Sequence, residues 1–240
     1  MRATEETNVL VKPLRSAALT AAAAVLVAGC GAAHPGAAAD VDGYRIEMDT
    51  VNEQAAALCL APRLLGIAEG QRLDRSSSRR AVVGVKVQLR MAELAADELG
   101  IEVPAPQVTE DELFSQGIPI GEYSESETEA MLEFWGEFRH MSELIQQISL
   151  QLREETGVEG AELDSEVFAF LEEQVDDVDI DPRVGLEGDL TPTSPSGSLS
   201  VPVSDLAQPP PATGPEPQTA EEAERSQSFV SGLPASQTCG

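Results

Sequence analysis

Residues 126–155, SETEAMLEFWGEFRHMSELIQQISLQLREE, carry the clearest structural pattern in the sequence. Apolar side chains recur at intervals of three and four residues along this stretch, which places them on one face of an α-helix. The positions that form the stripe are Met131, Phe134, Phe138, Met141, Ile145, Ile148 and Leu152, widened by Trp135. We therefore expect one long amphipathic helix, around which the rest of the domain is built.

The first half of this helix concentrates aromatic residues in a chain that is only 4% aromatic. Methionine adapts its shape and aromatic rings bring a large contact area, so such a stripe can bind varied apolar segments. The alternative is that the stripe is ordinary hydrophobic core. The candidate peptide-binding residues are Met131, Phe134, Trp135, Phe138 and Met141.

Three further segments are expected to be helical. Residues 76–99 are ambiguous, because Val83, Val85 and Val87 alternate as in a strand, whereas the continuation has a helical pattern that ends at a glycine. We interpret the whole segment as one helix. Residues 109–112 form a capping box that opens a short helix, and residues 162–176 are expected to form another.

A hairpin followed by a helix is expected near the start of the domain. In residues 41–48, Asp42-Gly43 supplies the turn, and apolar residues alternate with polar ones on its far side. Asp49 is a candidate N-cap for a helix that runs to Leu60.

The last part of the domain is expected to return to strands. Val178 and Ile180 alternate with polar residues, as do the apolar residues of 199–203. The fold class predicted from these elements is mainly α. It consists of a helical lobe closed by a small β-sheet that pairs N- and C-terminal segments.

The first 29 residues have the layout of a bacterial export signal. Three basic residues precede an apolar stretch at 16–27, which is shorter than the roughly 20 apolar residues that cross a bilayer. Residues 1–29 are therefore expected to be a signal peptide. The basic residues are Arg2, Lys12 and Arg15.

The end of this signal, Val27-Ala28-Gly29-Cys30, resembles the bacterial lipobox. The resemblance implies that Cys30 receives a diacylglyceryl group and that the chain is cut before it. Two acyl chains give stable anchoring. We expect a lipoprotein on the extracytoplasmic face of the cell membrane; the alternative is an ordinary signal peptide with a chance cysteine.

Composition divides the remaining chain into a tether, one domain and a tail. Residues 30–39 are small and are expected to tether the lipid to a domain over 40–204. Residues 205–240 are rich in Pro, Ser and Glu and are expected to be disordered. Cys59 and Cys239 are a candidate disulfide in an oxidising compartment. The alternative is a buried Cys59 thiol and a free Cys239.

Charge excludes several kinds of partner. The formal net charge of −27 repels nucleic acid and anionic lipid surfaces, so membrane attachment would depend on the lipid alone. The basic residues cluster between positions 63 and 90. They would receive an acidic partner, or else pair with acids of the same fold or simply be solvated. They are Arg63, Arg72, Arg75, Arg79, Arg80, Lys86 and Arg90.

Signatures of enzymes, metal sites and cofactors are missing from the sequence. There is no phosphate-binding glycine loop, no zinc motif and no nucleophile elbow. Residues 177–181 begin like a calcium loop, but Pro182 stands where the loop requires glycine. We therefore expect a binding protein with no enzymatic activity, no metal and no cofactor.

The order of the segments resembles the SurA-like chaperone N-terminal domain, in the lipoprotein version of high-GC Gram-positive bacteria. The motifs that carry the resemblance are VDGYRI at 41–46, AADELGIEV at 95–103, and DVDIDPRVG at 177–185 with SGSLSVPVSD at 196–205. The resemblance implies a helical lobe with an apolar cleft that binds unfolded exported polypeptides. Only residues 185–197 separate the helical part from the last strand, so no peptidyl-prolyl isomerase domain is expected. The alternative function is a structural or adaptor lipoprotein that docks one cell-envelope partner.

Overall fold

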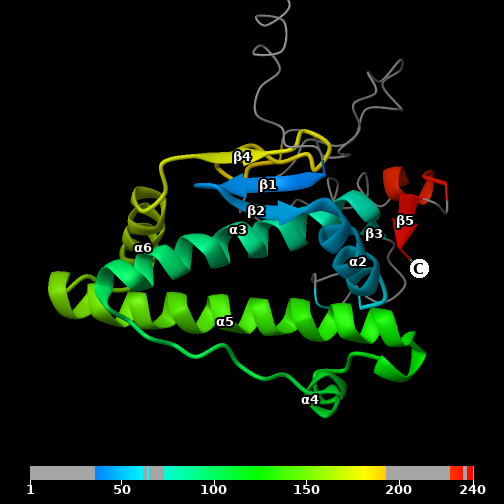
Figure 1. The fold of residues 1–240 in the computed structure, drawn as a ribbon, viewed down its shortest axis with the longest axis horizontal. Coiled ribbons are helices and arrows are strands. Elements are labelled where there is room, and N and C mark those ends of the chain that lie inside the picture. Colours follow the sequence, from blue (N-terminus) through cyan, green and yellow to red (C-terminus); the bar gives the residue numbers. More distant parts are fainter. Residues whose placement is uncertain (1–35, 62–63, 65–72, 193–227, 235–236, 240) are drawn as a thin grey trace, which may run out of the picture. The chain divides into compact units, whose positions relative to one another are not determined.

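The computed structural model describes residues 36–61, 64, 73–192, 228–234 and 237–239. This part of the chain is mainly helical and carries a small three-stranded antiparallel sheet, which confirms the predicted fold class. The sheet lies against one side of helix α3, and helix α5 lies along the other side (Figure 1). None of the described helices is both long and apolar enough to cross a membrane.

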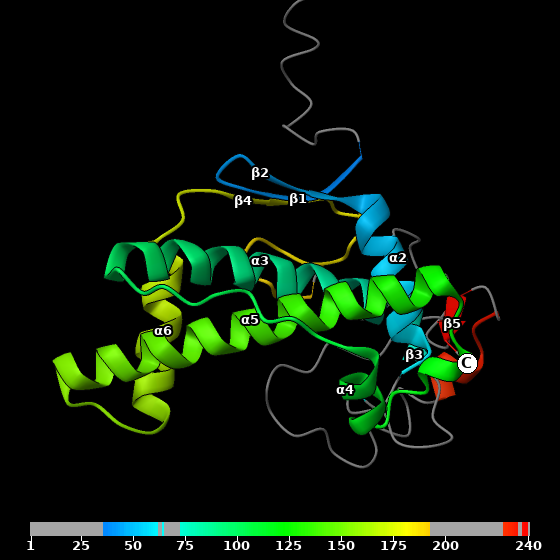
Figure 2. The same cartoon turned by 60° about the horizontal axis from the view of Figure 1, so that its bottom comes forward.

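The helical lobe is built on three helices that pack against one another: α2 (Met48–Cys59), α3 (Arg75–Leu99) and α5 (Glu125–Thr156). Helix α6 (Ala161–Glu173) contacts both α3 and α5 at the other end of the lobe from α2 (Figure 2). The short helix α4 (Glu110–Ser115) and a 3₁₀ turn, Ile120–Glu122, lead into α5.

The long helix α5 begins and ends as its sequence requires. Ser124 and Glu127 form a complete capping box, in which the Ser124 side chain accepts from Glu127 N and the Glu127 carboxylate accepts from Ser124 N. Gly157 ends the helix in the left-handed conformation (φ 74°). The predicted amphipathic helix is confirmed over its whole length.

Helix α3 resolves the ambiguous segment as one helix. Val83, Val87, Met91 and Ala95 follow one another at intervals of four and are all buried, so the helical period decides the structure. Gly100 ends the helix with φ 67°. Asp74 caps its start by accepting a hydrogen bond from Ser77 N at 2.9 Å, and Thr109 caps α4 in the same way through Glu112 N.

The sheet has the strand order β2-β1-β4. Strands β1 (Ala37–Val41) and β2 (Tyr44–Glu47) form the predicted hairpin, with Val41 paired to Tyr44 and a bulge between Ala37 and Ala39. Strand β4 (Val178–Ile180) pairs with the free side of β1, Ala39 opposite Ile180. The predicted strand over 199–203 lies outside the described residues.

The Asp42-Gly43 turn also ties the hairpin to the chain that enters β4. Asp42 and Gly43 both have positive φ, 50° and 80°, as this turn requires. The Asp42 carboxylate accepts hydrogen bonds from the backbone N–H groups of Asp176 and Asp177 at 2.9–3.2 Å. The backbone just before β4 is therefore held in place.

Two predicted boundaries need correction at the start of the domain. The tether was expected to reach residue 39, but Ala37, Ala38 and Ala39 are buried in β1. Because all three residues are alanine, this part of β1 lacks the apolar–polar alternation by which a strand is recognised in a sequence. Asp49 is not the N-cap of α2 either. Glu47 occupies that position and makes no side-chain cap, while Asp49 lies in the first turn.

The end of the tail is ordered, contrary to the expectation of disorder over 205–240. Strand β5 (Thr238–Cys239) pairs antiparallel with β3 (Leu73–Asp74), and a short helical turn precedes it at 228–231. Thr238 and Cys239 are both buried. Composition predicts disorder for a whole segment and cannot register a single covalent attachment at its end.

Candidate functional site

The aromatic stripe on α5 is mostly core. Met131, Phe134 and Met141 are 0, 4 and 7% exposed, so they do not line an open cleft. Helix α5 is covered on one side by α2 and α3, and near Gly136 by the backbone of Pro106 and the side chain of Val108. The prediction that Met131, Phe134 and Met141 line a cleft is wrong, because three neighbouring segments cover this helix.

Trp135 and Phe138 remain partly exposed. Their rings stack with centroids 5.3 Å apart and planes 30° apart, and Trp135 packs against the core. The Trp135 indole N–H is buried and finds no hydrogen-bond partner among the described residues. The stacked rings of Trp135 and Phe138 therefore cover part of each other's apolar surface.

An apolar depression of about 420 Å³ lies elsewhere, at the end of the lobe formed by α6. We call it the Phe168 depression. Its lining comes from α3, α6, the segment that enters β4, and the loop that follows β4. The apolar lining residues are Met91, Phe168, Leu171, Val175, Val178 and Leu190.

Phe168 is the one aromatic side chain of this depression, and it is 53% exposed. The buried face of α6 is formed by Leu163, Val167 and Leu171, at intervals of four. Phe168 lies one position beyond that face and so extends along the rim of the packed surface. A large apolar side chain that is half exposed in this position is available to a ligand.

One wall of the depression is a tight reverse turn, in which Leu186 bridges to Pro192. Leu190 has φ 63°, an uncommon value for a non-glycine residue, and its N–H donates to Glu187 O at 2.9 Å. Gly188 lies so close to β4 that a Cβ there would be 2.9 Å from Val178 O. This wall is therefore pressed against the sheet and holds Leu190 in place.

Four carboxylates surround the apolar floor: Glu172, Asp176, Asp177 and Asp189. All four residues are exposed, and none of them forms an ion pair within the described ranges. Hydrogen bonds from the Thr191 side chain and backbone to Asp189 lower the pKa of this carboxyl below its usual value. The Phe168 depression thus combines an apolar floor with negative charge.

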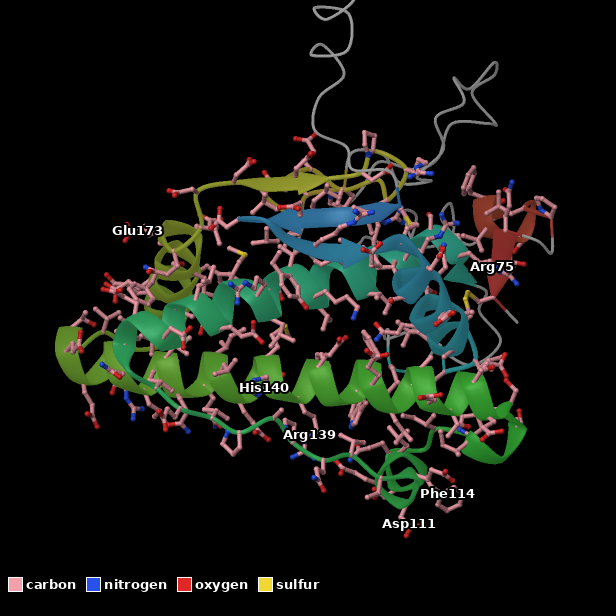
Figure 3. All side chains as sticks on the ribbon, viewed as in Figure 1. Arg75, Asp111, Phe114, Arg139, His140 and Glu173 are labelled. Carbon is pink, nitrogen blue, oxygen red and sulfur yellow. A yellow bond between two sulfur atoms is a disulfide. The ribbon has the colours of Figure 1, made fainter. Side chains whose placement is uncertain are left out.

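A second depression is wider and shallower. It lies where α4 and the 3₁₀ turn approach the start of α5, and it is bordered by Phe114, Tyr123 and several acids. Phe114 and Asp111 extend from α4 into solvent (Figure 3). Burial, followed by the charges of Glu127 and Glu122, raises the pKa of Tyr123 to about 12, so its hydroxyl stays neutral.

Three of the basic residues on α3, Arg80, Lys86 and Arg90, pair with acids of the same fold, which agrees with one of the predicted alternatives for these residues. Lys86 Nζ donates to Glu137 Oε1 at 2.6 Å and Oε2 at 2.8 Å, and Gln54 Nε2 donates to Oε2 at 3.3 Å. We call these three residues, from α3, α5 and α2, the junction. Arg90 pairs with Glu93 and lies over the Tyr44 ring.

Burial dominates the chemistry of the junction. The Lys86 and Glu137 side chains are only 11 and 22% exposed. Loss of hydration raises the pKa of Glu137, and the hydrogen bond and charge of Lys86 act in the opposite direction. Gln54 Oε1 is buried and has no hydrogen-bond partner among the described residues. The junction is therefore a closed, structural ion pair.

The structure joins Cys59 of α2 to Cys239 of β5 through a disulfide, with Cα atoms 5.0 Å apart. Ser78 Oγ lies 3.4 Å from Cys59 Sγ and 3.5 Å from Cys239 Sγ. Arg75 and Arg79 line a depression of about 240 Å³ beside Cys59. Cys30, the predicted lipidation site, lies outside the described residues, as does the predicted signal peptide.

No protein-family model, curated protein or solved structure matches the chain significantly. Within the described ranges, no group of three or more His, Cys, Asp or Glu side chains is arranged to hold a metal ion. The Phe168 depression could not be predicted from the sequence, because its lining comes from four separate segments. The available signal was Phe168 itself, a large apolar residue beside the apolar positions of its helix.

Proposed function

We propose that the protein is an exported, lipid-anchored binding protein that holds apolar segments of other exported polypeptides, in the manner of a chaperone. The observation that carries the proposal is the position of Phe168, which is half exposed beside an apolar floor. The aromatic stripe on α5, by contrast, is largely buried. The lipid on Cys30 would keep the lobe at the membrane surface, where newly exported chains emerge.

Physical magnitudes favour weak, reversible binding at this site. Complete burial of one apolar side chain contributes roughly 1.5–3 kcal/mol, and the depression of about 420 Å³ accepts only a short segment. Binding of this strength suits a protein that releases its clients without an energy source. The strong net charge of −27 keeps the complexes apart from one another.

Aggregation of an unfolded client tests the proposal. The purified processed protein should slow light scattering by the client at equimolar or higher ratios, and Phe168→Ala should weaken this effect. Phe114→Ala is the matched control, because Phe114 is also exposed but lies on α4, away from the depression. No effect of the wild-type protein on scattering, or equal effects of the two variants, would argue against the proposed site.

A second candidate function is docking to one dedicated partner of the cell envelope. The burial of Met131, Phe134 and Met141 favours it, because these three side chains of α5 do not line an open cleft. Crosslinking in cells distinguishes the two functions. One dominant crosslinked partner supports docking, whereas a wide range of exported proteins supports chaperone-like binding.

A further inference from the structure

The carboxylates around the Phe168 depression carry surplus negative charge, because no described base pairs with them, whereas several acids elsewhere on the lobe are paired. Lys86 binds Glu137, and Arg139 binds Glu112 and Glu143. Around the depression, by contrast, the described residues supply no basic partner to Glu172, Asp176, Asp177 or Asp189. The surplus charge is therefore free to interact with a ligand.

Several of these carboxylates belong to backbone that is fixed in place. The N–H groups of Asp176 and Asp177 are both held by the Asp42 carboxylate of the hairpin turn. Asp189 Oδ1 accepts from Thr191 N at 2.9 Å and from Thr191 Oγ1 at 2.6 Å. A ligand that meets groups already held in position loses less conformational entropy on binding.

The apolar floor and the acidic rim select the same kind of side chain. Lysine and arginine lay their aliphatic stems along apolar surface while their charged ends remain in a polar environment. A guanidinium or ammonium group is also attracted to the face of an aromatic ring such as that of Phe168. An acidic segment would instead bring like charges together.

We infer that the Phe168 depression selects polypeptide segments in which lysine or arginine flanks an apolar residue. The apolar residue occupies the floor beside Phe168 and Leu171, and the basic residues reach Glu172, Asp176 and Asp177. This inference rests on the proposed polypeptide-binding function and specifies its ligand. It assigns the acids of the rim a role in recognition.

Three fluorescently labelled peptides with the same apolar centre and with flanking Lys, Ser or Glu residues provide the test. Their dissociation constants for the full processed protein are measured by fluorescence anisotropy. The Lys peptide should bind about five- to tenfold more tightly than the Ser peptide, because two or three exposed ion pairs each contribute modestly. The Glu peptide should bind most weakly, and salt should weaken the Lys peptide most.

The double variant Glu172→Gln/Asp177→Asn should reduce the preference for Lys over Ser to less than twofold. Its matched control is Asp164→Asn/Glu173→Gln, which removes the same charge from exposed positions of α6 outside the depression. Glu173 is labelled in Figure 3. The control should keep the full preference. Equal losses of preference in the two double variants would assign the effect to overall charge, and no loss in either would show that these acids do not set the preference; either result would overturn the inference.

The experiment separates failure of the inference from failure of the proposed function. Equal affinities of the wild-type protein for the Lys and Ser peptides, both reduced by Phe168→Ala, would refute the charge selection and leave peptide binding intact. Absence of saturable binding by all three peptides would refute the proposed function and the inference together.

Discussion

The junction and the Phe168 depression both place charged groups beside apolar side chains, yet only the junction pairs them. At the junction, Lys86 meets both oxygens of Glu137 in a nearly closed setting. At the depression, Glu172 and its neighbours face solvent, and none of them pairs with a basic residue of the described ranges. Charge at the junction therefore serves the fold, whereas the fold does not require the charge at the depression.

Breaking the junction should be one of the two largest effects. Lys86→Met leaves Glu137 as an almost buried charge, so the free energy of unfolding should fall by about 3 kcal/mol in urea titrations at neutral pH. The folded-state pKa of Glu137 is already raised by burial and should rise further without Lys86. The loss of stability should therefore shrink as pH falls through that raised pKa, where the folded protein takes up the proton.

The double variant Lys86→Met/Glu137→Leu is the control for this prediction. Replacing both partners removes the buried charge together with its counterion and should recover most of the lost stability. Equal losses in the single and double variants would show that the site needs the shape of these side chains rather than their pairing.

Removing the disulfide should have an effect of similar size. Cys59 and Cys239 are separated by 180 positions, so the bond removes much of the entropy of the unfolded chain. The variant Cys59→Ala/Cys239→Ala should lose about 2–4 kcal/mol of unfolding free energy in urea. Reduced wild-type protein should match the variant, and an identical midpoint for the oxidised and reduced proteins would contradict the prediction.

Packing at the wall of the depression should have an intermediate effect. Gly188→Ala places a Cβ 2.9 Å from Val178 O, which is backbone and cannot rotate away, so we expect a loss of about 1–3 kcal/mol. Gly84→Ala is the opposite control, because a Cβ at this position of α3 meets nothing within 4 Å. It should gain about 0.5–1 kcal/mol. Losses of similar size in both variants, measured by urea unfolding, would contradict this account of Gly188.

The smallest change in stability is expected at the rim itself. Glu172→Gln removes one of several neighbouring like charges and breaks no ion pair of the described structure, so its unfolding free energy should stay within about 0.5 kcal/mol of wild type. A loss above 1 kcal/mol in urea would show that this carboxylate supports the fold, and the comparison with the junction would fail.

The helices could be predicted because their apolar residues differ sharply from the polar residues between them. Helix α5 shows this over Met131 to Leu152, and its capping residues mark where it begins. Strand β1 could not be found in the same way, because alanines cover its core-facing and opposite sides alike. Helical period and capping are local properties, so the sequence alone reveals them.

The candidate site depends on properties that are not local. The stripe on α5 correctly indicated an apolar face, but whether another element covers that face depends on the rest of the fold. The Phe168 depression unites Met91, Phe168 and Leu190, which are far apart in the chain, through the docking of α6 and the turn after β4. Only an exposed aromatic beside the buried face of a helix could have pointed to it.

The bond between Cys59 and Cys239 also decides how the protein responds to proteolysis. A single nick at any peptide bond between these two residues leaves both fragments in one covalent molecule. A cut in the long segment between residue 192 and residue 228 would therefore go unnoticed on a non-reducing gel and become visible only after reduction. In an oxidising environment, the last strand stays attached to the lobe even when the chain that leads to it has been severed.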